Sequence, residues 1–182
     1  MSNRHKVFVS YHHDKDENHK NVFELRFGNS ADILVKGSVQ LGDIDPNSNT
    51  EYVRQKIRDE YLSSSSVTVV LVGIHTWQRK HVDWEIYASM RDTQNNPRSG
   101  LLGILLPSYA DVHGLSKYDA HTIPPRLADN LKTGYAKLYN WSNNPAEVQE
   151  WIHEAYLRKV GVQPDNSRVM FANNRTGDRW ND

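Results

Sequence analysis

A glutamate within a helical pattern is the first candidate for chemistry in this 182-residue chain. The segment WQRKHVDWEIYASMR places apolar side chains at every fourth position, which predicts a helix with one buried stripe: Val82, Ile86 and Met90. Glu85 lies about 100° around such a helix from Ile86, so we expect it to border the stripe without entering it. Its carboxylate can face a cleft, or it can be a solvated side chain paired with His81 or Ser89.

A second concentration of reactive side chains is the stretch HHDKDENH, from His12 to His19. Imidazoles and carboxylates are metal ligands, but the stretch has neither an H-E-x-x-H helix nor a familiar zinc spacing. Loops that bind hard cations need a more regular pattern of oxygen ligands. We therefore expect no metal site, and no resident cofactor.

The elements that must position these residues alternate between strands and helices. Five short β-branched or aliphatic runs have the length of strands: 6–11, 33–40, 67–73, 101–107 and 136–141. Helical patterns cover 16–27, 50–62, the segment that contains Glu85, and 145–160, where Asn144 can cap the helix that Pro145 begins. The third and fourth runs are apolar almost throughout, as in central parallel strands covered on both faces. The pattern predicts a doubly wound, flavodoxin-like α/β fold with a parallel five-stranded sheet and helices on both faces.

Sheets of this kind bind ligands beyond the carboxyl ends of their strands. We expect four loops around one cleft there: 10–16, 42–49, 74–80 and 107–125. We assign residues 1–161 to this domain. The polar stretch 162–182 is interrupted only by Val169, Met170 and Phe171, so we expect a mobile C-terminal tail. The alternative is an arm whose Val-Met-Phe triplet docks onto its own domain or onto a second subunit.

The composition excludes several classes of function. Lys+Arg and Asp+Glu balance at 22 each, so no net charge would draw the protein to nucleic acid or to an anionic membrane. The absence of cysteine excludes a disulfide framework, a zinc-thiolate cluster and a thiol nucleophile. No apolar run approaches the roughly 20 residues that span a bilayer, and the N-terminus lacks the apolar stretch of a secretory signal. We expect a cytoplasmic protein without a membrane segment.

Several motifs occur in the order typical of a known family. The opening KVFVSYHHDKD, the loop LGDIDPNSN, the apolar third strand and the helix ending in WEIYAS resemble a TIR-like domain, and more narrowly the ThsB subunit of the bacterial Thoeris anti-phage defence system. The resemblance implies cleavage of the nicotinamide–ribose bond of NAD by a glutamate on the third helix, a position that Glu85 matches. The implied product is a cyclic ADP-ribose-type signal that activates a partner NAD-consuming effector. TIR enzymes commonly assemble, so a homo-oligomer is also implied.

Two loops at the predicted cleft then supply candidates for binding NAD. Ser10 and Tyr11 end the first strand, where a hydroxyl and a ring can meet the nucleotide, or where they simply finish a strand and pack. Asp43 and Asp45 can hold a ribose, although Asp, Asn, Pro and Gly also make ordinary turns.

The segment before Glu85 supplies the remaining candidates. Arg79 and Lys80 can pair with the pyrophosphate, unless they face solvent as most basic residues do. Many TIR domains carry a tryptophan four residues before the catalytic glutamate, whereas this chain has His81 there and a tryptophan at Trp77. We therefore count Lys80, Trp77 and His81 among the substrate-binding residues.

Other functions share this fold. A non-catalytic TIR module would assemble through its loops and the face near Trp84, a residue that needs a partner, loop or ligand to cover it. A nucleoside deoxyribosyltransferase also uses a glutamate on a related glycosidic bond. A phosphoacceptor receiver domain needs an aspartate after the third strand, where this chain has VGIH, and a dehydrogenase needs G-x-G-x-x-G after the first strand, where it has SYHH. The sequence disfavours these last two.

Overall fold

The computed structural model describes residues 5–28, 33–36, 52, 55–94 and 96–182. All neighbouring strands of its sheet run parallel, in the order β2-β1-β3-β4-β5. The strands are β1 (His5–Ser10), β2 (Ile33–Lys36), β3 (Val67–Val72), β4 (Gly100–Leu105) and β5 (Ala136–Asn140). This order is that of the flavodoxin-like doubly wound sheet, so the predicted parallel α/β arrangement is confirmed. Residues 37–40 of the second predicted strand lie outside the described residues.

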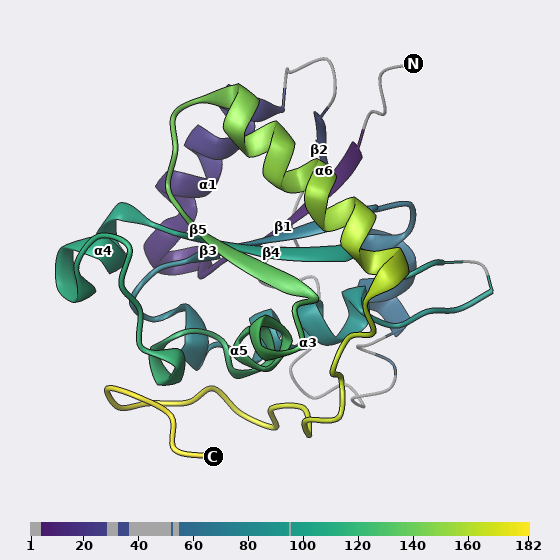
Figure 1. Ribbon diagram of the computed structural model, residues 1–182. Helices are drawn as coiled ribbons and strands as arrows, with labels where there is room; N and C mark the ends of the chain where they lie inside the picture. Colours follow the sequence, from purple (N-terminus) through teal and green to yellow (C-terminus); the bar gives the residue numbers. More distant parts are fainter. Residues whose placement is uncertain (1–4, 29–32, 37–51, 53–54, 95) are drawn as a thin grey trace.

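Helices cover both faces of the sheet (Figure 1). On one face lie α1 (His13–Phe27) and α6 (Pro145–Gly161), and on the other lie α3 (Lys80–Ser89) and α5 (Pro125–Lys132). Every residue of β3 and β4 is buried, which agrees with their uninterrupted apolar sequences VTVVLV and GLLGIL. The two largest buried apolar clusters of the described residues therefore lie on opposite faces of the sheet, one beneath each pair of helices.

The boundaries of α6 follow its local sequence. Pro145 occupies the first turn, and the side chain of Asn144 accepts a hydrogen bond of 3.0 Å from the backbone N–H of Ala146. Its buried positions repeat with the period of a helix: Val148, Ile152 and Ala155. The predicted helix 145–160 is confirmed.

Other helical segments differ from the prediction. The first helix begins at His13 rather than at Asp16, and Gly28 follows its last residue, Phe27. Of the predicted helix 50–62, the described part ends in a short π-helix, η1 (Ile57–Leu62). The segment that contains Glu85 is divided at Arg79 between the 3₁₀ turn η2 (Thr76–Gln78) and α3.

The loop region predicted at 107–125 is mostly helical. It contains α4 (Pro107–His113) and the 3₁₀ turn η3 (Ala120–Thr122), and α5 begins at its end. These elements are too short to show a helical period in the sequence. Along the described chain, no helix is both long and apolar enough to cross a membrane.

Residues 162–182, here called the C-terminal arm, lie against the domain beneath α3 and α5 (Figure 1). Phe171 and Trp180 are each only 5% exposed, whereas Val169 is 85% exposed. The expectation of a mobile tail is therefore wrong, and the docking alternative is correct for Phe171 but not for Val169. Composition misled because the arm is held mainly by hydrogen bonds and ion pairs, which leave no apolar pattern in the sequence.

Candidate functional site

Glu85 is fully buried within α3. Its neighbours on the helix form the predicted stripe, with Val82 and Ile86 inaccessible and Met90 3% exposed. We expected Glu85 to border this stripe without entering it, with a solvated side chain as the alternative, and its burial contradicts that alternative. The physical reason is that β1 ends beside this turn of the helix, and its last residue supplies a partner for the carboxylate.

That partner is Ser10, whose hydroxyl donates a short hydrogen bond to Glu85 Oε2. The other carboxylate oxygen, Oε1, is buried without a hydrogen-bond partner in the part of the chain that the structure describes. Burial raises the pKa of Glu85 to about 8, and the hydrogen bond from Ser10 opposes that rise. Without a ligand, Glu85 is thus poised to change its charge near neutral pH.

A group of aromatic and imidazole rings connects α3 to the end of β1. The ring of His81 lies with Nε2 3.1 Å from the backbone carbonyl oxygen of Tyr11. The ring of His13 is tilted against both neighbouring rings, with centroids 4.5 Å from His81 and 4.6 Å from Tyr11. Burial, followed by the proximity of His13, lowers the pKa of His81 to about 3, so this imidazole is neutral at physiological pH. His81 therefore joins the two elements that carry Ser10 and Glu85.

Two predicted substrate-binding residues point elsewhere. Trp77 is 2% exposed and belongs to the apolar layer under α3 and α5, because η2 turns its side chain toward the sheet. The ammonium of Lys80 lies 5.1 Å from the ring centroid of Trp84, on a different side of α3 from Glu85. Asp43 and Asp45 fall outside the described residues.

Sequence reasoning missed a second buried carboxylate at this edge. Asp16 is 4% exposed, and Thr76 Oγ1 lies 3.3 Å from its Oδ2. Burial raises the pKa of Asp16, although the hydrogen bond from Thr76 opposes that rise. A Cβ at Gly73 would lie 2.4 Å from the Asp16 carboxylate, so only glycine leaves room for it. The sequence signal that could have revealed this contact is Gly73, because a glycine directly after an apolar strand often marks a close approach of another group.

A comparison with protein families shows which family the chain belongs to. The family model described as Thoeris protein ThsB, TIR-like domain, matches residues 8–111, which is more than half of the chain. The chain belongs to this ThsB TIR-like family. The matched stretch runs from β1 into α4 and includes Ser10, His81 and Glu85. A search of curated proteins found no match.

Outside the ThsB match, the C-terminal arm follows the outer side of α3 along its length. The arm contacts both ends of the helix, because Asn166 Nδ2 donates to the carbonyl of Tyr87 at 3.1 Å and Asn174 Oδ1 accepts from the N–H of Lys80 at 3.0 Å. Between them, Trp84 Nε1 donates to the carbonyl of Phe171 at 2.8 Å. Trp84 is consequently only 7% exposed, so the cover that the sequence required is the protein's own arm. The predicted assembly face near Trp84 is therefore not exposed.

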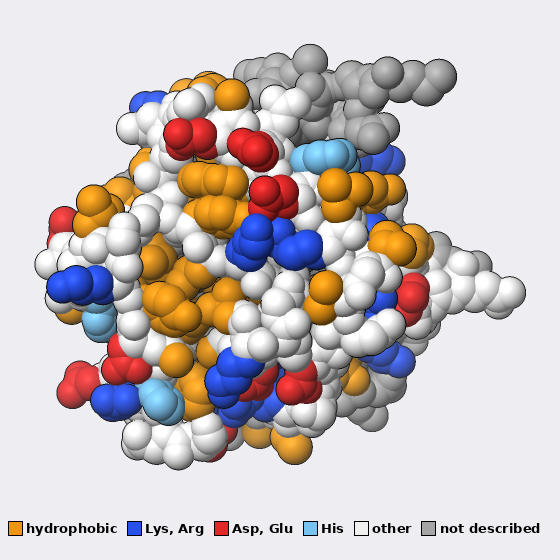
Figure 2. Space-filling model, viewed as in Figure 1, with side chains coloured by type: hydrophobic (Ala, Val, Ile, Leu, Met, Phe, Trp, Pro, Cys, Tyr) orange, Lys and Arg blue, Asp and Glu red, His pale blue; other side chains and the backbone are white. Residues whose placement is uncertain are grey.

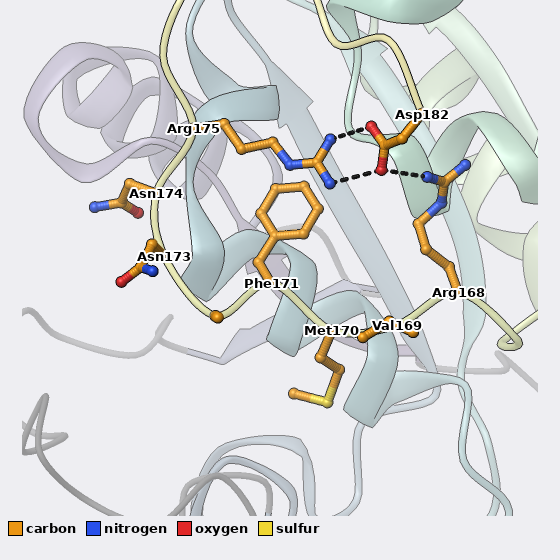
Figure 3. A pocket seen from close by; sticks show the side chains of 9 residues that line it. Arg168, Val169, Met170, Phe171, Asn173, Asn174, Arg175 and Asp182 are labelled. Carbon is orange, nitrogen blue, oxygen red and sulfur yellow. Dashed lines mark hydrogen bonds and ion pairs between the residues drawn. The ribbon is translucent and has the colours of Figure 1, made fainter.

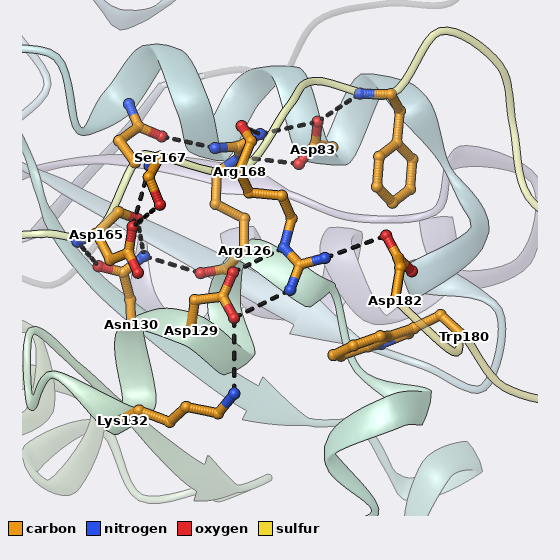
Figure 4. Close-up of polar contacts among 12 residues, drawn as sticks. Asp83, Arg126, Asp129, Asn130, Lys132, Asp165, Ser167, Arg168, Trp180 and Asp182 are labelled. Atoms are coloured by element: carbon orange, nitrogen blue, oxygen red, sulfur yellow. Dashed lines mark hydrogen bonds and ion pairs between the residues drawn. The ribbon is translucent and has the colours of Figure 1, made fainter.

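A buried ion pair fastens this arm to the domain (Figure 4). Arg126 Nε donates to Asp83 Oδ1 at 2.8 Å, and both side chains are at most 2% exposed. Asp83 Oδ2 also accepts from the backbone N–H of Phe171 at 3.0 Å, while Arg126 donates to the carbonyl of Arg168 at 2.9 Å. Asp83 lies two residues from Glu85 in sequence, and the pair joins α3, α5 and the arm.

Two cavities lie away from Glu85. One, of about 490 Å³, is formed by the arm itself, where Arg168 and Arg175 both contact Asp182 (Figure 3). The other, of about 330 Å³, lies between α4 and the end of β5, and Figure 2 shows hydrophobic side chains gathered in this region. Its lining includes Leu105, Pro107, Leu115 and Trp141. Neither cavity contains a residue of the Glu85 site.

Proposed function

We propose that this protein cleaves the nicotinamide–ribose bond of NAD and that Glu85 is the catalytic carboxylate. The observation that carries the proposal is the state of Glu85: a fully buried carboxylate, held through one oxygen by Ser10 and with the other oxygen unpartnered. Strongly shifted acids in such surroundings cluster at functional sites. Membership of the ThsB TIR-like family supports the same assignment.

One carboxylate is sufficient for this reaction. The nicotinamide ring carries a positive charge in NAD and leaves as a neutral molecule, so no general acid is required, unlike in O-glycoside hydrolysis. The C–N bond breaks with its electron pair passing to nicotinamide, and positive charge develops on the ribose. Glu85 stabilises that charge electrostatically and accepts hydrogen bonds from the ribose hydroxyls.

The positive charge of the substrate also explains how a raised pKa is compatible with this role. An opposite charge within about 4–6 Å favours the ionised form of a carboxyl group. Binding of the cationic nicotinamide riboside moiety therefore lowers the pKa of Glu85 and converts it to the carboxylate. Glu85 therefore becomes ionised, and the site active, when the cationic substrate is bound.

The fate of the ribosyl cation determines the product. If water attacks its C1″, the product is ADP-ribose; if a hydroxyl of the same ADP-ribose attacks and loses its proton, the product is cyclic. A buried site that excludes water favours the second outcome. We propose a cyclic ADP-ribose-type signal that activates a partner NAD-consuming effector.

The test compares the full chain with its Glu85→Gln and Glu150→Gln variants. Glu150 is exposed on α6, so it is the matched control for loss of a carboxylate. Incubation with NAD should release nicotinamide from the wild type and from Glu150→Gln, and at least about 10²-fold more slowly from Glu85→Gln. Mass spectrometry of the second product distinguishes ADP-ribose from a cyclic isomer.

A defence enzyme can require a signal of infection, so the same proteins should also be assayed in lysate from phage-infected cells. NAD turnover that persists in Glu85→Gln would overturn the proposal. Cleavage of deoxynucleosides but not of NAD would instead assign the site to a deoxyribosyltransferase.

A further inference from the structure

Buried polar atoms without partners gather at one edge of the sheet. Among the described residues, eight buried side-chain nitrogen or oxygen atoms lack a hydrogen-bond partner, and four of them belong to residues around the ends of β1 and β3: His12 Nδ1, His13 Nε2, Arg79 Nε and Glu85 Oε1. A buried polar atom without a partner is unfavourable unless something satisfies it. A cluster of three potential donors and one acceptor at one edge indicates that a polar ligand completes the site.

The three nitrogen-bearing side chains lie at the same edge of the sheet. His12 and His13 follow β1 after one intervening residue, Tyr11, and Arg79 precedes the first residue of α3. Burial, and next the charge of Arg79, lowers the pKa of His12 to about 4. Burial also lowers the pKa of His13, where Arg79 contributes in the same direction. The guanidinium of Arg79 therefore lies within electrostatic reach of both imidazoles.

This cluster is also tied to Glu85. His13 packs on His81 at a centroid distance of 4.5 Å, and His81 precedes Glu85 by four residues, or one helical turn. Arg79 precedes Glu85 by six residues, roughly 9 Å along the helix axis. The N-terminus of α1 adds positive potential at the same place through its free backbone N–H groups, and the side chain of its capping residue, His12, makes no bond to them.

We propose that Arg79, His12 and His13 form the subsite that holds the diphosphate of the substrate while Glu85 contacts the ribose that carries nicotinamide. The proposal rests on the proposed function and deepens it. A guanidinium suits the geometry of phosphate oxygens, and imidazole N–H groups donate to the same oxygens. The carboxylates of Asp14 and Glu17 on α1 are exposed to solvent, which screens their repulsion of an anion.

The first test measures binding without catalysis. ADP-ribose, inorganic pyrophosphate and adenosine are each titrated by calorimetry into the full-length Glu85→Gln protein, with and without Arg79→Gln. Arg79→Gln should weaken binding of ADP-ribose and pyrophosphate about tenfold or more, and leave adenosine unchanged. Arg26→Gln, which removes an exposed arginine from the last turn of α1, is the charge-matched control.

Paired substitutions test the imidazoles atom by atom. An asparagine amide can replace Nδ1 of a histidine, and a glutamine amide can replace Nε2. Because the unpartnered atom is Nδ1 in His12 and Nε2 in His13, His12→Asn and His13→Gln should retain pyrophosphate binding. His12→Gln and His13→Asn should weaken it about tenfold. A purely structural role would not produce this reciprocal pattern, and thermal unfolding of each variant verifies that it folds.

The outcomes separate this proposal from the proposed function. Pyrophosphate binding that depends on Arg79 supports the subsite even if the wild type fails to cleave NAD. Where NAD is cleaved, Arg79→Gln should raise KM for NAD about tenfold with kcat within twofold, and should not affect nicotinamide riboside, which has no diphosphate. The subsite is overturned if Glu85→Gln binds neither ADP-ribose nor pyrophosphate, or if Arg79→Gln binds both as tightly as Glu85→Gln alone.

Discussion

Trp84 Nε1 donates a hydrogen bond of 2.8 Å to the backbone carbonyl of Phe171, which lies 87 positions later in the chain. This bond connects the middle of α3 to the middle of the C-terminal arm, directly beside Glu85 in sequence. The helix with the candidate catalytic residue is thus held from two sides, by the sheet on one and by the arm on the other.

The N-terminus of α3 is capped by the arm, so we predict that Asn174→Ala destabilises the protein by about 1 kcal/mol. The Oδ1 atom of Asn174 accepts from the N–H of Lys80, one of the first-turn N–H groups that have no partner within the helix. Asn173→Ala is the matched control, because Asn173 is an exposed neighbour. Urea unfolding measures both free energies, and equal values for the two variants would contradict the capping role.

Among the contacts that hold the arm, we expect substitution of the Asp83–Arg126 ion pair to reduce stability the most. Asp83→Asn leaves the buried guanidinium of Arg126 without a compensating charge, so we expect a loss of about 3–5 kcal/mol in the free energy of unfolding. The exposed Lys137–Glu154 pair provides the contrast, since Lys137→Gln should cost less than about 1 kcal/mol. A similar small cost for both variants would show that Arg126 gains water when Asp83 is changed.

The raised pKa of Glu85 predicts that the stability of the wild type depends on pH in a particular direction. Between the ordinary pKa of 4.5 and the folded value of about 8, the folded protein keeps a proton that the unfolded chain has released. The contribution of Glu85 to stability therefore falls as pH rises through this window, at up to about 1.4 kcal/mol per pH unit.

Glu85→Gln isolates this effect, because glutamine does not titrate and every other titratable side chain is the same in both proteins. Urea unfolding at pH 5 should give the two proteins similar stabilities, and at pH 8 the variant should be the more stable. A difference that does not change between pH 5 and pH 8 would be inconsistent with a raised pKa.

Ser10 should tune the reaction through Glu85. Its hydroxyl lowers the pKa of the carboxyl group against the effect of burial, so Ser10→Ala should raise that pKa further. We expect kcat/KM for NAD to fall about tenfold at neutral pH and its acidic limb to move to higher pH. Ser89→Ala is the control. It removes a buried hydroxyl that lies on α3 like Glu85 but donates to the backbone carbonyl of Ile86. An unshifted pH profile in Ser10→Ala would separate the serine from the chemistry.

Local sequence was sufficient for the strands and for the best-marked helix. The apolar runs at 67–73 and 101–107 predicted β3 and β4 to within about two residues, and the cap at Asn144 located the start of α6. These features depend on side chains a few positions apart, so periodicity and capping residues reveal them. The resemblance to a TIR-like domain added the candidate role of Glu85, which spacing alone left open.

Tertiary structure decided how deeply Glu85 is buried and what covers its helix. Its partner Ser10 lies 75 positions earlier, and the arm residue Phe171 lies 88 positions after Asp83. Helical period places Glu85 beside a buried stripe, but only the neighbouring strand end converts that position into an inaccessible one. Hydrogen bonds between such distant residues have no periodic signature, which is why a polar sequence at 162–182 resembled a mobile tail and is instead a docked arm.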